Sequence, residues 1–268
     1  MHHERPDHPG GADASAPDPA PLAALVRSHV LDAELGGLLW LLLDARTPVL
    51  VAGPAGSGRR PLAAALEALL PSAAVRLAVR GAVEDFAWLP EARSLGWRHG
   101  GNDAAAPVAG ARPGSGVLVV RDLADGASGG PDGERARIIV RALSLGYGLV
   151  ATMQGTRLDD VLERLGAPEI GADADACSRL GVVLVMAPPD PARGPRVAAA
   201  HYVRPVALDT HGHVQRPAPA VLATWSGQAD RWDHFAWGLL PDLGGRVGRS
   251  PIDVEREQAR RAAAIATA

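Results

Sequence analysis

The sequence contains no lysine, so its 27 basic residues are all arginine. With 30 acidic residues the formal net charge is -3, which gives no basic field of the kind that collects nucleic-acid phosphates. We therefore expect no DNA or RNA partner. Cysteine is almost absent as well. Cys177 stands alone, so no internal disulfide can form, and a reducing cytoplasm is the expected compartment.

Long apolar runs are also missing. The most apolar stretch, Leu38 to Leu43, is closed by Asp44 and falls far short of the roughly 20 residues that a membrane-spanning helix needs. The opening segment MHHERPDHPG has no apolar signal core. We expect a cytoplasmic protein with no direct membrane insertion. Residues 1–20, rich in Pro, Asp, Ala and His, have the composition of a disordered tail.

From residue 21 to residue 190, short β-branched runs alternate with helical patterns. Two helices are expected between Pro21 and Arg46, with others at residues 61–70, 134–145 and 157–165. The expected strands are TPVLVAG, VRLAV, GVLVV, GLVAT and VVLVM, at residues 47–53, 75–79, 116–120, 148–152 and 182–186. This alternation predicts an α/β fold with a mostly parallel sheet flanked by helices.

After Pro191 the pattern changes to longer β-rich segments separated by the turn clusters DTHG and SGQAD. It predicts a C-terminal antiparallel β meander over residues 191–240, packed on the core, and a tail or helix over 241–268. His211 and His213 lie in this region, but no cysteine or acidic ligand is spaced to complete a site with them. We predict no metal site.

The segment that follows the first predicted strand has the glycine spacing of a phosphate-binding loop; it consists of Gly53, Pro54, Ala55, Gly56, Ser57, Gly58, Arg59 and Arg60. A complete loop has Lys at position 59 to reach the β and γ phosphates and Ser or Thr at position 60 to place a hydroxyl on Mg²⁺. Arg59 still offers a bidentate phosphate donor. Arg60 cannot ligate a cation, and its charge opposes Mg²⁺. The alternative is a plain tight turn between strand and helix.

The segment ATMQGTRLDDVLERL, at 151–165, resembles without a gap the ATLHANSAEDALERL-type segment of the ATPases that drive type II secretion, type IV secretion and tight-adherence pili. LLWLLLDARTPVLVAGPAGSG is similar to the helix, strand and loop before that family's phosphate site, and HYVRPVALDTHGHVQRPAPAVLATW is similar to the strands after its core. The resemblance spans roughly residues 25–225. It implies a P-loop NTPase core at 21–190 with ATP or ADP as the ligand, and we expect the family's separate N-terminal domain to be lacking.

Carried over residue by residue, the resemblance implies an altered catalytic site. Glu84 matches a family acid just beyond the second strand, where the acidic pair that precedes it is replaced by Arg and Gly. When Arg121-Asp122 is aligned with the Arg-Asp after the Walker B strand, Leu118 and Val119 stand where the family has Gly and Glu. The carboxylate that orients the attacking water is then missing.

Two further positions belong to the same predicted site. Asp122 directly follows an apolar strand, the position at which P-loop enzymes hold Mg²⁺, so it is an alternative metal-side acid. Gln154 replaces the histidine of the family's His box and cannot exchange protons near neutral pH.

These substitutions predict a secretion-ATPase-like protein that binds ATP or ADP, with Mg²⁺ binding impaired and hydrolysis weakened or absent, acting as an accessory or regulatory subunit. The implied partners are a homo- or hetero-oligomeric ring with an active secretion or pilus ATPase, and inner-membrane platform proteins. One alternative is an active motor in which Arg59 binds phosphate and Asp122 or Glu84 serves metal and water. A second is a scaffold subunit with a vestigial loop.

Overall fold

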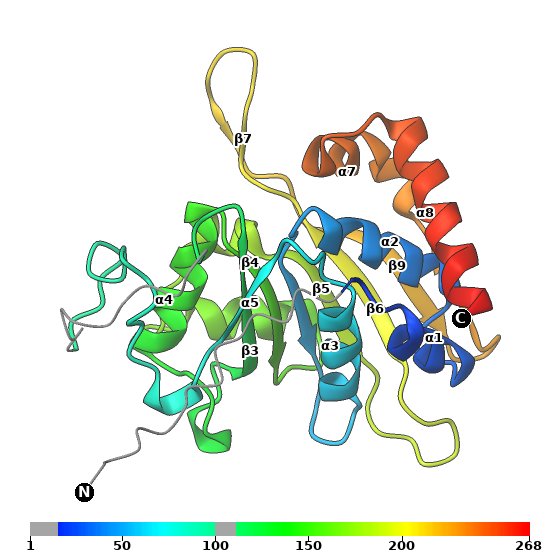
Figure 1. Cartoon of the computed structure of the whole chain (residues 1–268), viewed down its shortest axis with the longest axis horizontal. Coiled ribbons are helices and arrows are strands. Elements are labelled where there is room, and N and C mark those ends of the chain that lie inside the picture. The colour runs from blue at the N-terminus through cyan, green and yellow to red at the C-terminus, as the bar shows by residue number, and fades with distance from the viewer. Residues whose placement is uncertain (1–15, 100–110) are drawn as a thin grey trace, which may run out of the picture.

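The computed structural model describes residues 16–99 and 111–268 and contains an eight-stranded sheet with helices on both faces (Figure 1). The strands lie in the order β10-β9-β6-β5-β1-β4-β3-β2. Their bounds are β1 Val49–Ala52, β2 Val75–Ala78, β3 Gly116–Leu123, β4 Gly148–Met153, β5 Gly181–Met186, β6 Val197–Val203, β9 Ala220–Ser226 and β10 Arg231–His234. Of the tail expected at residues 1–20, the first 15 residues lie outside the described part.

The helices alternate with the strands of the first half and close the chain after the second half. They are α1 Ala20–Arg27, α2 Ala33–Asp44, α3 Arg59–Ala68, α4 Glu134–Ala142, α5 Leu158–Gly166, α6 Ala174–Cys177, α7 Leu240–Val247 and α8 Pro251–Thr267. No helix in the described ranges is both long and apolar enough to cross a bilayer.

The five strands β2, β3, β4, β1 and β5 are mutually parallel. Every residue of β1, β4 and β5 is buried, because helices cover both faces at the middle of the sheet. This explains why these strands are continuous apolar runs and do not alternate apolar with polar residues. The predicted α/β class and mostly parallel sheet are confirmed.

The C-terminal strands are antiparallel, as expected, and they extend the same sheet. β6 pairs antiparallel with β5, β9 pairs with β6, and β10 pairs with β9. The hairpin of β7 (Ala207–Leu208) and β8 (Val214–Gln215) forms a separate two-stranded arm that projects from the body of the molecule (Figure 1).

Two apolar clusters, one on each face, hold the layers together. Helices α1, α2, α3, α7 and α8 contribute buried side chains to one cluster, and α4, α5 and α6 contribute to the other. The first and last helices therefore pack on the same face, where α8 lies along α1 and α2 (Figure 1).

The contact between α2 and α8 is close and partly polar. A Cβ added at Gly37 would lie 2.5 Å from the carbonyl oxygen of Gln258 and 2.7 Å from the amide nitrogen of Ala262. The buried Arg261 of α8 donates from Nη1 to the Trp40 carbonyl at 3.0 Å and from Nη2 to Asp44 Oδ2 at 2.9 Å. The predicted C-terminal helix is thus held against α2 by close backbone packing at Gly37 and by the hydrogen bonds of the buried Arg261.

The arrangement of crossovers creates a topological switch point between β1 and β4. β1 and β4 are neighbours, but α3, which follows β1, packs in one apolar cluster, whereas α5, which follows β4, packs in the other. The chain therefore crosses to opposite faces of the sheet after these two adjacent strands. In open α/β sheets ligands bind outside the carboxyl ends of strands at such a point.

Candidate functional site

The segment Gly53 to Gly58, called the glycine loop below, connects the carboxyl end of β1 to the first turn of α3. Gly56 and Gly58 have φ of 77° and 87°, which favour glycine. At Gly58 an added Cβ would also lie 2.8 Å from Pro195 Cβ, and at Gly53 it would overlap Ser57 Oγ. Glycine is thus required at position 56 by the backbone conformation, at position 53 by the close approach of Ser57, and at position 58 by both the conformation and the approach of Pro195.

Two buried polar atoms where the glycine loop meets α3 have no hydrogen-bond partner in the described structure. They are Ser57 Oγ, in a residue that is 1% exposed, and Arg59 Nε. Buried polar atoms are nearly always paired, so unpaired ones call for an explanation such as an absent ion or ligand. Both atoms lie at the amino end of α3, where backbone amides and the helix dipole favour an anion.

Arg59 lies across the glycine loop. Its side chain is 8% exposed, and Nη1 donates to the Gly53 carbonyl oxygen at 2.8 Å. Nη2 donates to Asp122 Oδ1 at 3.1 Å. Arg60, which is mostly exposed, donates from Nη2 to the other carboxylate oxygen, Oδ2 of Asp122. The two arginines that follow the glycine loop therefore hold one carboxylate between them.

Asp122 reaches this position through an irregularity in β3. The register between β3 and β4 shifts between Val120 and Leu123, and Asp122 adopts a positive φ of 51°. Its amide donates to Thr152 Oγ1 at 2.9 Å, which fixes the bulge to β4. Bulges of this kind re-aim a side chain, and this one directs a buried carboxylate at the amino end of α3.

The electrostatics of Asp122 follow from this position. Burial acts to raise the pKa of its carboxyl, but hydrogen bonds from Arg60 and Arg59, together with their charges, outweigh burial and bring the pKa below its usual value. The same contact with Asp122 raises the pKa of Arg60. At neutral pH the cluster holds two positive charges and one negative charge.

Gln154, at the carboxyl end of β4, lies at the rim of the same site. Its Nε2 donates to Asp125 Oδ2 at 2.7 Å. The pKa of Asp125 is lowered first by its hydrogen bond from the Ser128 hydroxyl and then by that from Gln154, with a contribution from the charge of Arg59. Asp125 was not among the residues expected from the sequence, where Asp125-Gly126 looks only like a turn signal.

Glu84 is not brought together with these residues. It is 1% exposed, and its carboxylate accepts from the amides of its neighbours Arg80, Asp85 and Phe86 and from Trp88 Nε1 at distances of 2.7–3.2 Å. In the described ranges, no hydrogen bond or ion pair joins this carboxylate to the glycine loop. Glu84 organises the segment after β2.

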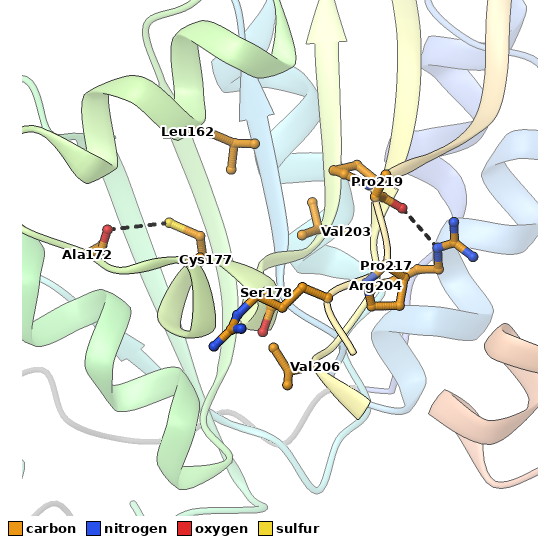
Figure 2. Close-up of a pocket in the computed structure, with 12 residues that line it drawn as sticks. Leu162, Ala172, Cys177, Ser178, Val203, Arg204, Val206, Pro217 and Pro219 are labelled. Atoms are coloured by element: carbon orange, nitrogen blue, oxygen red, sulfur yellow. Dashed lines mark hydrogen bonds between the residues drawn. The ribbon is translucent and has the colours of Figure 1, made fainter. Parts of the chain in front are cut away.

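One pocket lies beside α3, and a second lies near α5 and α6. A pocket of about 300 Å³ runs along the first turns of α3, next to β3 and β4, and has Arg60 and Thr152 in its wall. Another, of about 380 Å³, lies between α5, α6 and the base of the β7–β8 arm and is mostly apolar (Figure 2). Cys177 lines it, and burial raises the pKa of its thiol to about 11, so the thiol is a poor nucleophile at neutral pH.

Among the described residues, no group of three or more His, Cys, Asp or Glu side chains is placed to hold a metal ion. Asp122 is an acid that the sequence suggested for magnesium, and both of its oxygens are hydrogen-bonded to guanidinium groups.

The sequence was also compared with known proteins. No model of a protein family and no curated protein matches this chain.

Proposed function

We propose that this chain is a P-loop nucleotide-binding protein of the secretion-ATPase type, with hydrolysis weakened or absent, which serves as a cytoplasmic accessory subunit. Support comes from the position of the glycine loop, between a central parallel strand and the amino end of α3, at the carboxyl edge of the sheet. The unpaired Ser57 Oγ and Arg59 Nε add to it, since a phosphate would accept hydrogen bonds from both.

The observation that carries the proposal is the Arg59–Asp122–Arg60 cluster. The residues present do not fit a catalytic magnesium ion, because Arg60 presents a cation where a hydroxyl ligand would be required and Asp122 already bridges two cations. A metal would have to displace two charge-assisted hydrogen bonds to reach that carboxylate. Phosphate binding through arginine, by contrast, needs no metal.

Activation of water is also poorly supported. Val119 stands at the position that the resemblance assigns to the water-orienting glutamate, and Gln154 cannot accept a proton in the physiological range. Asp125 lies nearby, but its lowered pKa makes it a weak base. The nucleotide would therefore act as a structural or regulatory ligand. Possible partners remain an active secretion or pilus ATPase and inner-membrane platform proteins.

The proposal is tested by titrating the purified protein with a fluorescent ATP analogue, with and without Mg²⁺, and then assaying phosphate release in the same sample. We expect saturable binding with a Kd of about 0.1–1 mM, that is about -4 to -5.5 kcal/mol, with little effect of Mg²⁺ and no turnover. Turnover that requires Mg²⁺ and is lost in Asp122→Asn would establish an active motor. Absence of any saturation would favour the scaffold alternative.

A further inference from the structure

The Arg59–Asp122–Arg60 cluster has a second consequence if the glycine loop binds phosphate. A phosphate at the amino end of α3 would draw on the same two guanidinium groups that Asp122 now holds through Nη2 of Arg59 and Nη2 of Arg60. Asp122 is also only 3% exposed, so its charge is poorly screened by water. A ligand phosphate would meet a buried negative charge of the same sign.

We infer that Asp122 is an internal counter-ion that competes with ligand phosphate for Arg59 and Arg60, so that this site takes a metal-free polyphosphate, the diphosphate end of a nucleotide or free pyrophosphate, and takes it weakly while Asp122 is charged. This inference rests on the proposed function. It reverses the role that Asp122 would have as a magnesium ligand, in which the carboxylate would strengthen nucleotide binding.

The two arginines differ in how they take part. Arg59 is buried and tied to the Gly53 carbonyl, so it stays at the glycine loop whether or not a ligand is present. The Arg60 side chain is 61% exposed and borders the open pocket beside α3. It is free to turn from Asp122 toward a ligand. Arg59 therefore provides the fixed donor and Arg60 the adjustable one.

A backbone hydrogen bond and the bulge in β3 hold Asp122 in the position from which it would compete with a phosphate. The hydrogen bond from its amide to Thr152 Oγ1 and the bulge in β3 hold the backbone. Among the described residues, the carboxylate is held by the two arginines and by a long contact with the Thr152 hydroxyl at 3.5 Å. Removing the charge at this position should thus weaken the hold on both guanidinium groups without moving the glycine loop.

The test is calorimetric titration of the full chain with sodium pyrophosphate and with ADP, in EDTA and then in Mg²⁺. We expect Asp122→Asn to bind both about tenfold more tightly than the parent in EDTA, since it removes a buried like charge, with no further gain from Mg²⁺. Asp175→Asn is the matched control: Asp175 also pairs with an arginine, Arg216, but on the exposed surface of α6. It should bind as the parent does.

Asp122→Asn leaves the buried Arg59 without its counter-charge and is destabilised for that reason, so the melting temperature is recorded with and without pyrophosphate. Arg60→Gln is the second variant, because its exposed position keeps the fold intact. With Asp122 still charged and one donor lost, it should bind pyrophosphate about fivefold more weakly than the parent in EDTA.

Tighter binding by Asp122→Asn together with weaker binding by Arg60→Gln supports the inference. If the parent binds but Asp122→Asn binds no better, or loses a magnesium-dependent gain, the counter-ion role is wrong while nucleotide binding stands. If neither parent nor variants bind pyrophosphate or ADP, the proposed function fails, and the inference fails with it.

Discussion

Arg59 and Arg60 are neighbours in sequence and share one carboxylate, yet only Arg59 is buried. The difference arises because successive residues of a helix point about 100° apart, so one side chain lies over the glycine loop and the next reaches solvent. A substitution at either position therefore changes a different property. At 59 it alters the arginine that we propose as the fixed phosphate donor, and at 60 it removes one of the two guanidinium groups that hold Asp122.

The double variant Arg59→Lys, Arg60→Thr tests the position of the phosphate site. It supplies the ammonium and the hydroxyl of a complete phosphate loop and leaves one oxygen of Asp122 free. We expect nucleotide binding that is about tenfold stronger and now enhanced by Mg²⁺, but without full activity, since Val119 and Gln154 are unchanged. Isothermal titration and phosphate release measure both. A double variant that binds no better than the parent would show that the site is misplaced.

At the scale of elements, α8 approaches α2 closely. Gly37 permits it, because the backbone of α8 lies where a side chain at this position would begin. The long separation in sequence between α2 and α8 means that no local pattern marks Gly37 as a contact residue.

We expect Gly37→Ala to lower the free energy of unfolding by about 1–3 kcal/mol, because backbone atoms of α8 cannot move aside as a flexible side chain would. Gly245→Ala, on α7, is the control. That glycine is exposed with nothing within 4 Å of an added Cβ, and the change should raise stability by about 0.5–1 kcal/mol through helix propensity. Urea unfolding of both variants is the measurement. Equal effects of the two substitutions would contradict the close contact.

The elements themselves were largely predictable. The strands at 75–79, 116–120, 148–152 and 182–186 and the helices near 134–145 and 157–165 appear within a few residues of their expected bounds. Their apolar runs are long enough to fix the element type locally. The bulge that re-aims Asp122 was not predictable, because it depends on pairing with β4 and on the hydroxyl of Thr152.

For the whole molecule, acid should be strongly destabilising. Glu257 on α8 has a pKa lowered to about 2, first by its hydrogen bond with Arg260 and, against the effect of burial, also by Arg261. Since the folded-state pKa lies below the ordinary value of 4.5, this group stabilises the fold above about pH 4.5 and loses that contribution as the pH falls toward 2. Asp122, whose pKa is also lowered, acts in the same direction.

The free energy of unfolding, measured by urea at several pH values, should therefore fall steeply below about pH 4.5. Glu257→Gln should flatten part of this fall. Glu255→Gln, an exposed position on the same helix, should leave the profile unchanged. If the free energy of unfolding of Glu257→Gln fell as steeply as that of the parent, the ion pairs of Glu257 with Arg260 and Arg261 would not account for the acid sensitivity.

The sequence by itself determined the order and type of the elements, the place of the glycine loop and the presence of two arginines where a complete phosphate-binding loop has lysine and a hydroxyl residue. These follow from local periodicity, glycine spacing and residue identity. Only the tertiary structure decided that Asp122 meets both arginines across 62 and 63 residues of chain, that Gln154 pairs with Asp125, and that Glu84 serves its own loop. The reason is physical: strand order and bulges bring distant side chains together, and neither is fixed by the residues that happen to be neighbours along the chain.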